Sequence, residues 1–376
     1  MFMTKKIKIL ECIRQGHIGG GETHLLSLIE NLNKSLFEPI VLSFTDGPMI
    51  DQLKNQGIKT FVIHTTNPFD FTKWHKVKKL LMEEQVDLVH AHGTRANSNV
   101  FWAARSLNIP VIYTVHAWSF HDDQAVLMKK VRILSEKYLT SRMNVNISVS
   151  ESNKQSGKKY INKFDSVVIN NGIDHKKFAP ANNYKNVRKE LGINPDAILV
   201  LFIARFTMHK QPLMLIRAFA KAVKQLPQLK LLMVGDGNEK QKALELVKLL
   251  GIEDSVCFQP FRQDVPDVLA AADIFVLPSL WEGLPIALLE AMAMGKAVIG
   301  TRVDGTSEVI QHNVNGLLIE VNDMPEKLTE CLVLLGTNES LRNKIREKAI
   351  ETVQSRFNAS CMTRQIENVY KELVLH

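Results

Sequence analysis

Short apolar runs alternate with helical patterns along the whole chain, and this alternation limits the possible folds more than any other feature. The runs are rich in Val, Ile, Leu and Phe, each is about as long as one strand, and polar segments with helical spacing separate them. Strands that are joined through helices run parallel, because each helix carries the chain back to the start of the sheet. The sequence therefore predicts an α/β protein built from parallel sheets.

The predicted strands form two sets, one in each half of the chain. The first set is IKILECI, PIVLSF, TFVIH, VDLVHAH, PVIYTVHA, MNVNISVS and DSVVINNGI, and the second set is AILVLFIA, KLLMVGDG, VCFQPF, DIFVLPS, AVIGT and GLLIE. Each set is sufficient for its own Rossmann-like sheet, and 376 residues are enough for two domains. Residues 170–195, rich in Asn, Gly and Pro, are the predicted linker, and residues 338–375 are predicted to be helical.

The composition is that of an ordinary globular protein, with 45% hydrophobic and 23% charged residues. The longest apolar run, AILVLFIA, is far shorter than the roughly 18–20 residues needed to span a bilayer. The N-terminal lysines lead directly into a strand without a small-residue cleavage site, so we expect no signal peptide. The four cysteines lack CxxC spacing and are expected to be reduced thiols of a cytoplasmic protein.

The net charge of +8 is confined to the first half of the chain. Residues 1–180 contain 24 Lys and Arg against 16 Asp and Glu, whereas residues 181–376 contain 23 of each kind. Such a basic surface is either simply solvated or contacts an anionic membrane or a phosphorylated acceptor. Aromatic residues are few and no nucleic-acid motif occurs, so we expect no nucleic-acid partner. Two basic clusters lie on predicted helices: Lys73, Lys76, Lys78 and Lys79, and then Lys129, Lys130 and Arg132.

Two glutamates flank a proline in the stretch PSLWEGLPIALLEAMAMG. The run before it predicts a buried strand, and a helix is predicted over about 285–294, with Pro285 at its first position and Gly295 just past its end. Glu282 then lies in the loop and Glu290 in the helix. Open α/β sheets bind ligands at such loops, and a helix N-terminus favours phosphate. The alternative is that Glu290 caps a neighbouring group and Glu282 is only solvated.

Three other loops at predicted strand ends carry groups suited to an anionic ligand. The loop GHIGGGETH offers glycines that allow backbone amides to approach a ligand, and RFTMHKQP places Arg205 and Lys210 beside a helix start, where two cations could bind a diphosphate. His116 directly follows another strand. The alternative for the glycine loop is an ordinary turn, and the alternative for Arg205 and Lys210 is a pair of surface cations. The alternative for His116, and equally for His90 and His92, is an ordinary core histidine. Neither DxD nor HExxH occurs, so no metal site is predicted.

Seven motifs follow one another in a familiar order. They are GGGE (19–22), TVHAW (114–118), INNGID, ARFTMHK (204–210), MVGDG (233–237), AADIFVLPSLWEGLPIALLEAMA (271–293) and NVNGLLI (313–319). Together they resemble the retaining GT-B glycosyltransferases of family 4, and the block around Glu282 and Glu290 resembles the EX7E signature of that family.

The resemblance implies an α/β fold with two Rossmann-like domains that face each other across a cleft. The expected acceptor domain is 1–178, joined by a C-terminal helix of about 358–376 that crosses back to it. The expected donor domain is 179–357.

The resemblance also implies roles for single residues. Glu290 would bind the ribose hydroxyls, Glu282 the donor sugar, and Arg205 and Lys210 the diphosphate, whose leaving charge they would stabilise. His116 would lie near the donor sugar and the acceptor. The implied catalytic residues are His116, Arg205, Lys210 and Glu282, and the implied donor-binding residues are Gly20, Gly21, Arg205, Lys210, Arg262, Glu282, Gly283, Leu284, Pro285, Ile286 and Glu290. No metal ion and no other cofactor is expected.

Three positions depart from the pattern of the family. Gln211 stands where a glycine often follows the lysine, and Pro260 stands where another glycine is common, which leaves the base-binding loop near Phe261 and Arg262 open. The GLP sequence after Glu282 lacks a frequent aromatic residue, which leaves the donor sugar open.

The resemblance implies a retaining glycosyltransferase that moves a sugar from a nucleoside diphosphate, with UDP expected, to a hydroxyl acceptor. The expected mechanism is a front-face step through an oxocarbenium-like state. The basic first half favours a lipid-linked glycan of surface polysaccharide synthesis as the acceptor, and a cytoplasmic enzyme peripheral to the inner face of the membrane. The alternatives are a nucleotide-sugar epimerase of GT-B shape and a non-catalytic, membrane-peripheral protein that binds nucleotide-sugars.

Overall fold

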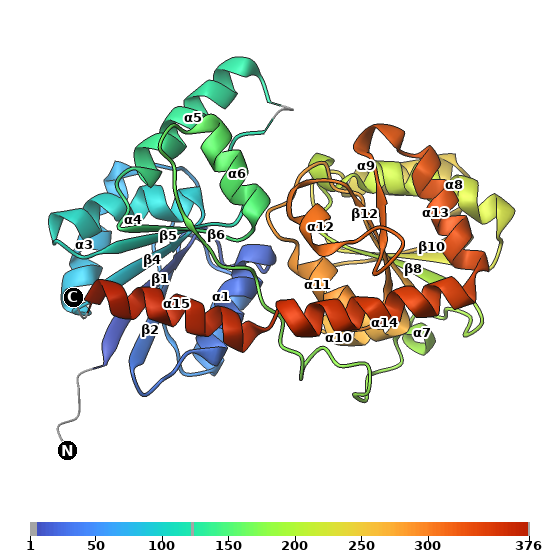
Figure 1. Ribbon diagram of the computed structural model, residues 1–376, viewed down its shortest axis with the longest axis horizontal. Coiled ribbons are helices and arrows are strands. Elements are labelled where there is room, and N and C mark those ends of the chain that lie inside the picture. Colours follow the sequence, from blue (N-terminus) through green and yellow to red (C-terminus); the bar gives the residue numbers. More distant parts are fainter. Residues whose placement is uncertain (1–5, 122–123, 375–376) are drawn as a thin grey trace. The chain divides into compact units, whose positions relative to one another are not determined.

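The computed structural model describes residues 6–121 and 124–374. It divides into two compact units (Figure 1): the first unit is Met1–Gly172 with Ala359–His376, and the second unit is Ile173–Asn358. The division lies slightly before the expected boundary at 178, and the returning segment begins at Ala359. The ends of the expected ranges at 1–5 and 375–376 lie outside the described residues.

The first unit is built on a seven-stranded parallel sheet with the order β3-β2-β1-β4-β5-β6-β7. Every strand falls on a predicted strand of the first half, so that prediction is confirmed. The strands are β1 (Ile7–Ile13), β2 (Phe37–Ser43), β3 (Lys59–Val62), β4 (Leu88–His92), β5 (Val111–Val115), β6 (Val145–Ser148) and β7 (Val167–Val168).

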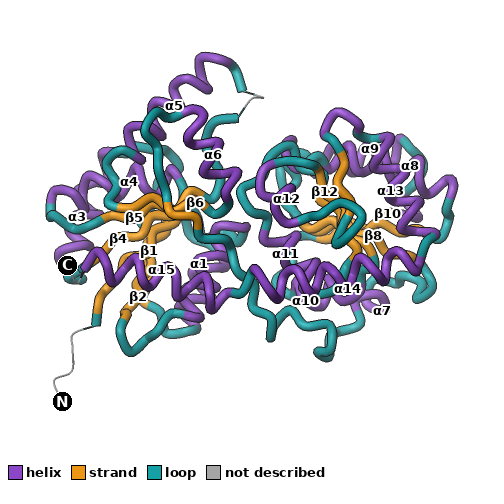
Figure 2. Tube along the Cα trace, viewed as in Figure 1, coloured by secondary structure: helices purple, strands orange, loops and turns teal. Residues whose placement is uncertain are grey.

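Helices lie on both faces of this sheet, as Figure 2 shows with the strands in orange and the helices in purple. They are α1 (Gly20–Asn31), α2 (Pro48–Asn55), α3 (Trp74–Glu83), α4 (Thr94–Ser106), α5 (Val126–Thr140), α6 (Glu151–Tyr160) and α15 (Ala359–Val374), with the 3-10 turn η1 (Phe71–Lys73) before α3. Covering both faces buries both sides of each strand, which explains why the strands read as nearly continuous apolar runs.

Alternate residues of β1 pack on opposite faces of the first sheet, as the two-residue period of a strand requires. Leu10 joins one core cluster, whereas Ile9 joins the cluster on the other face, which contains Met362 and Ile366 of α15. The helix α15 also lies beside α1 (Figure 1). The last helix thus completes the core of the first unit, and Glu11 points to the same face as Ile9.

The second unit contains a six-stranded parallel sheet with the order β10-β9-β8-β11-β12-β13. Each strand again falls on a predicted one. The strands are β8 (Ile198–Ile203), β9 (Leu229–Val234), β10 (Val256–Gln259), β11 (Ile274–Leu277), β12 (Ala297–Thr301) and β13 (Leu317–Ile319).

Helices also flank the second sheet (Figure 1). They are α7 (Val187–Glu190), α8 (Pro212–Gln225), α9 (Lys240–Leu249), α10 (Val265–Ala271), α11 (Ile286–Ala293), α12 (Asp304–Val309), α13 (Glu326–Thr337) and α14 (Glu339–Arg356), with the 3-10 turns η2 (Met208–Lys210), η3 (Glu253–Ser255) and η4 (Val321–Asp323). One large apolar cluster joins α8, α9 and α13 to one face of the sheet.

A helix that spans a bilayer needs about 20 predominantly apolar residues. Over residues 6–121 and 124–374, no helix is both long enough and apolar enough to cross a bilayer.

Candidate active site

The strand order of each sheet reverses at one point, and most of the predicted site residues follow the strands at that point. In the second unit β8 has β9 on one side and β11 on the other, so the loops after β8 and β11 leave the sheet in opposite directions. Open α/β sheets bind ligands in the crevice that such a reversal creates. Arg205 and Lys210 follow β8, and Glu282 follows β11.

The structure brings Lys210 and Glu282 into direct contact. Lys210 Nζ forms an ion pair with Glu282 Oε1, and both side chains are largely buried. Ser279 Oγ donates to the same carboxylate oxygen at 2.6 Å. Because the Glu282 carboxylate is held from two sides, it and the ammonium group are fixed at the strand ends before any ligand arrives.

Further contacts join the two loops behind this ion pair. Leu280 N donates to the His209 carbonyl at 2.8 Å, and the rings of His209 and Trp281 stack with centroids 4.0 Å apart. Glu282 N donates to Asp304 Oδ2 at 3.0 Å. The loops therefore form one connected structure that positions the charged groups.

Glu290 lies within α11 and is buried. Burial raises the pKa of its carboxyl to about 7, and the charge of Lys177 partly opposes this rise. A carboxyl of this kind gains from any ligand group that donates a hydrogen bond to its ionised form. The helix begins at Ile286 with Pro285 at the N-cap, one position later than expected, and Gly295 follows its end with φ +63° as expected.

The loop from Gly283 to Ile286 is packed tightly between neighbouring segments. Residues 283–286 are buried, and a Cβ placed on Gly305 would lie 2.0 Å from the Gly283 carbonyl oxygen. Only glycine fits at 305, because that oxygen is backbone and cannot move aside without shifting the loop. The start of α12 therefore fixes the path of the chain between Glu282 and Glu290.

Arg205 and Gln211 border this part of the second unit. Arg205 is exposed at the end of β8. Gln211, which replaces the frequent glycine, adopts a left-handed conformation with φ +54° and ψ +43°. Its Nε2 donates to the Met208 carbonyl at 2.7 Å. The backbone therefore has the conformation that favours glycine, and the glutamine side chain adds a local hydrogen bond.

Arg262 is held by two carboxylates of its own unit. Its guanidinium donates to Glu190 at 2.6 and 3.1 Å and to Asp264 at 2.9 and 2.6 Å. These bonds raise its pKa further above its usual range, Asp264 contributing most. A base-binding role for Arg262 would have to compete with both ion pairs, so that role stays a prediction.

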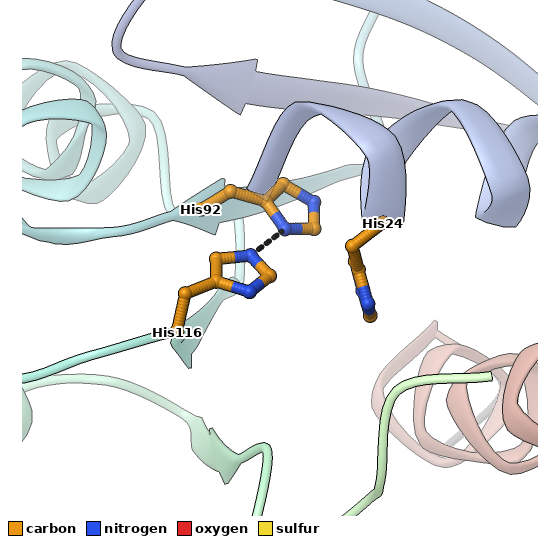
Figure 3. A group of neighbouring side chains, drawn as sticks. All are labelled: His24, His92 and His116. Carbon is orange, nitrogen blue, oxygen red and sulfur yellow. Dashed lines mark hydrogen bonds between the residues drawn. The ribbon is translucent and has the colours of Figure 1, made fainter. Parts of the chain in front are cut away.

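In the first unit the strand order reverses between β1 and β4. The helix α1 that follows β1 begins at Gly20, so Gly20 and Gly21 form its first turn. A Cβ on Gly21 would lie 3.5 Å from the His116 ring, which therefore packs against this turn. His92 ends β4 and His116 follows β5, which places both imidazoles at the carboxyl edge of the sheet (Figure 3).

A buried hydrogen-bonded network lies behind His116. His116 Nε2 is 3.1 Å from His92 Nδ1, and His92 Nε2 is 2.9 Å from Glu11 Oε2. Tyr370 of α15 donates to Glu11 Oε1 at 2.8 Å and lies 2.6 Å from His90 Nδ1. The C-terminal helix is thereby connected through Glu11 to the histidine at the strand end.

The network determines which nitrogen of each imidazole carries a proton. With the Glu11 oxygen as the acceptor of this bond, His92 Nε2 carries the hydrogen and His92 Nδ1 is an acceptor. His116 Nε2 must then donate to it, which leaves His116 Nδ1 with a lone pair. Burial, together with the positive charges that His24, His92 and Arg14 can carry, holds the pKa of His116 well below its usual range, so the ring is neutral at pH 7.

Sequence reasoning did not find Glu11, His24 or Tyr370. His24 Nδ1 is 2.9 Å from Asn171 Oδ1, and its ring meets that of His116 edge-on at 4.8 Å. The stretch VHAH carried one signal of the network, because His90 and His92 are two residues apart on a strand and therefore share a face. Tyr370 gave no such signal, since its contact depends on where α15 packs.

Two groups of described residues bring three potential metal ligands together: His24, His92 and His116, and Glu11, His90 and His92. Both groups lie in the first unit. Neither includes the residues predicted to bind the diphosphate.

The fold agrees with that of solved glycosyltransferases. The structure of Anabaena HepE in complex with UDP and glucose aligns with a TM-score of 0.86 at 22% identity, covering 97% of this chain and all of that one. The structure of the glycosyltransferase WaaG aligns with a TM-score of 0.78 at 18% identity, covering 96% and 99%. The two α/β units thus have the GT-B fold, and the predicted fold class is confirmed.

Two family descriptions match adjoining parts of the sequence. Glycosyltransferase Family 4 matches residues 18–177, and Glycosyl transferases group 1 matches residues 183–352. The N-acetyl-alpha-D-glucosaminyl L-malate synthase of Bacillus anthracis is 30% identical, covering 82% of this chain and 80% of its own. The chain belongs to the family 4 glycosyltransferases of the GT-B class, as its motifs predict.

A second relative matches over almost its full length. The Escherichia coli UDP-Gal:alpha-D-GlcNAc-diphosphoundecaprenol alpha-1,3-galactosyltransferase is 27% identical, covering 99% of this chain and 98% of its own. The name of that enzyme states a UDP-sugar donor and a lipid-linked acceptor.

Proposed function

We propose that the chain is a retaining glycosyltransferase that moves a sugar from UDP to a hydroxyl of a lipid-linked glycan. The observation that carries this proposal is the Lys210–Glu282 ion pair at the strand reversal of the second unit, with Arg205 at the end of the neighbouring strand. A cation fixed at that place suits a diphosphate, and an acidic oxygen beside it suits sugar hydroxyls.

The second unit supplies the groups for the donor. Arg205 and Lys210 bind the diphosphate and stabilise the charge that develops as the bond to the sugar breaks. Glu282 accepts hydrogen bonds from the sugar, and Glu290 accepts them from the ribose. Two cations can carry the charge of the leaving group, so no divalent metal is required for this step. The segment from Gly283 to Ile286 shapes the site between the two carboxylates.

The first unit supplies the groups near the acceptor. His116 presents a neutral imidazole held by His92 and Glu11. In the proposed front-face step the bond between the sugar and the diphosphate breaks, and the acceptor oxygen attacks the same face of the sugar. The acceptor proton goes to the departing diphosphate oxygen. The configuration is then retained without a covalent bond to the protein.

The helix α5 supports a membrane-bound acceptor. Its apolar side chains are unusually exposed, with Leu127 at 76%, Val126 at 71% and Leu134 at 64% accessibility. Lys130 and Lys137 are exposed on the same helix. A helix with exposed apolar and basic side chains fits an anionic bilayer surface, where apolar groups insert and cations meet lipid headgroups.

The basic cluster on α3 supports the same proposal less strongly. On α3, Lys78 lies over the Trp74 ring at 5.3 Å and Lys79 pairs with Glu83 at 3.5 Å. These contacts compete with lipid headgroups, so α5 is the main contact in the proposal. It places the enzyme at the cytoplasmic face of the membrane, in the synthesis of a surface polysaccharide.

Incubation with nucleotide-sugars distinguishes this proposal from its alternatives. A transferase without acceptor slowly releases sugar and nucleoside diphosphate, an epimerase yields an isomer of the donor, and a binding protein yields neither. We expect release of UDP and free sugar from one UDP-sugar, detected by mass spectrometry. An isomer without release, or an unchanged donor with every sugar, would contradict the proposal.

A further inference from the structure

Three imidazoles converge at the carboxyl edge of the first sheet (Figure 3). His24 comes from α1, His92 ends β4 and His116 follows β5, and one ring nitrogen of each lies within 4.8 Å of the others. His92 Nδ1 and His116 Nε2 are already 3.1 Å apart. Nitrogens on one tetrahedral Zn²⁺ are about 3.3 Å apart, given Zn–N bonds of about 2.0–2.1 Å. An approach of His24 by at most about 1.5 Å would therefore complete a three-histidine site.

Two of the imidazoles have the outer partners that metal-binding histidines usually have. His92 Nε2 donates to the buried Glu11 carboxylate at 2.9 Å, and His24 Nδ1 lies 2.9 Å from the oxygen of Asn171. An amide oxygen only accepts, so His24 Nδ1 carries the hydrogen and His24 Nε2 keeps its lone pair. Such partners fix the tautomer and orient the ring for a metal ion.

His24 Nε2 is a second, independent indication of a missing ligand. The atom is buried and has no hydrogen-bond partner within residues 6–121 and 124–374. A buried polar nitrogen without a partner loses the hydrogen bond that it would make to water. A bound ion would give this lone pair a partner.

We propose that His24, His92 and His116 bind one divalent transition-metal ion of the Zn²⁺ type and that the bound ion inhibits the enzyme by engaging His116. On binding, the hydrogen of His116 Nε2 is replaced by the ion, and the ring carries its hydrogen on Nδ1 instead. The inhibition rests on the proposed function of His116, whereas the binding does not.

The neighbouring group of Glu11, His90 and His92 is a weaker candidate. His90 Nε2 is 2.7 Å from Thr114 Oγ1, and its Nδ1 is engaged by Tyr370. An ion there would break several buried hydrogen bonds, whereas an ion at the three-histidine site replaces only one.

Zn²⁺ binding to the full chain is the direct test, measured by equilibrium dialysis and elemental analysis. We expect one ion per chain in the parent and an affinity in His24→Gln that is lower by at least the roughly 10–100-fold that the loss of an outer partner of a ligand costs. The control variants are His75→Gln and Cys361→Ser, which remove an exposed imidazole and an exposed thiol and should leave the affinity unchanged. Co²⁺ in place of Zn²⁺ should give the visible absorption of a low-coordinate site. Circular dichroism checks that each variant is folded.

An equal affinity in His24→Gln, or a loss in either control variant instead, would overturn the proposed site. Inhibition is measured separately. Zn²⁺ should reduce sugar release in the parent, more weakly in His24→Gln, and a chelator should reverse the effect. If Zn²⁺ binds as expected but leaves sugar release unaffected, the inhibitory role is wrong. If no sugar is released under any condition, the proposed function fails while the binding result still decides the metal site.

Discussion

At the residue scale, Glu290 is the group whose charge should respond most to a nucleotide. Its carboxyl is buried, with a pKa raised to about 7. If ribose hydroxyls donate hydrogen bonds to it, the bound nucleotide favours the ionised form, and below pH 7 part of the binding free energy must first remove the proton. Each pH unit below 7 therefore costs at most about 1.4 kcal/mol of binding free energy, which is a factor of about ten in affinity.

We therefore predict that the affinity for UDP falls as the pH is lowered from 8 to 5.5, and falls less in Glu290→Gln. The amide of the Glu290→Gln variant does not titrate, so the pH dependence of the variant's affinity for UDP comes from the phosphate and all other groups. Calorimetric titration of both proteins gives the comparison. Parallel pH profiles would show that the ionisation of Glu290 is not coupled to the nucleotide.

Gln211 provides a stability prediction at the same scale. Its left-handed backbone costs a non-glycine residue about 1–2 kcal/mol, and the bond from its side chain to Met208 returns part of this. Gln211→Gly should change the free energy of unfolding by no more than about 1 kcal/mol. The β-branched Gln211→Val is more strained in this conformation and loses the bond to Met208, so it should be destabilised by about 1 kcal/mol or more. Urea unfolding compares the two, and a glycine variant less stable than the valine variant would contradict the account.

At the scale of single elements, the sequence predicts all thirteen described strands and the start of α11 to within one residue. These features follow from local patterns: apolar runs between breakers, Pro285 before the helix and Gly295 after it. The Lys210–Glu282 pair and the Glu11–Tyr370 bond could not be predicted in this way, because each joins segments that are distant in the chain. Arg262 shows the same limit, since its partner Glu190 comes from α7.

The helix α5 is the element to which the membrane proposal applies. Binding to vesicles should rise with anionic lipid and fall at high salt. Lys130→Gln with Lys137→Gln should weaken it by about 2 kcal/mol, at about 1 kcal/mol per basic residue near the surface. Leu127→Ser with Leu134→Ser should also weaken it, since these exposed side chains would insert.

Sedimentation with vesicles measures both double variants. Lys76→Gln with Lys79→Gln on α3 is the matched comparison, and we expect a smaller loss. Binding that ignores lipid charge, salt and all three double variants would favour an acceptor in solution.

At the scale of the whole molecule, two units of similar construction each place polar site residues at the carboxyl edge of their sheet. In the first unit these are His92 and His116, and in the second unit they are Lys210 and Glu282. Membership of family 4 gives the two units the roles of acceptor and donor domain in the proposal. The central claim is that the cations of the second unit stabilise a leaving nucleoside diphosphate.

Turnover of a UDP-sugar in Arg205→Ala and Lys210→Ala tests that claim most directly. Losing one preorganised charge that stabilises a transition state costs about 100–1000-fold in kcat, so each variant should lose at least about 100-fold. Lys221→Ala, which removes an exposed cation paired with Glu326, is the matched control and should retain the parent rate. Circular dichroism confirms folding in each case. Near-parental turnover in both Arg205→Ala and Lys210→Ala would contradict the account.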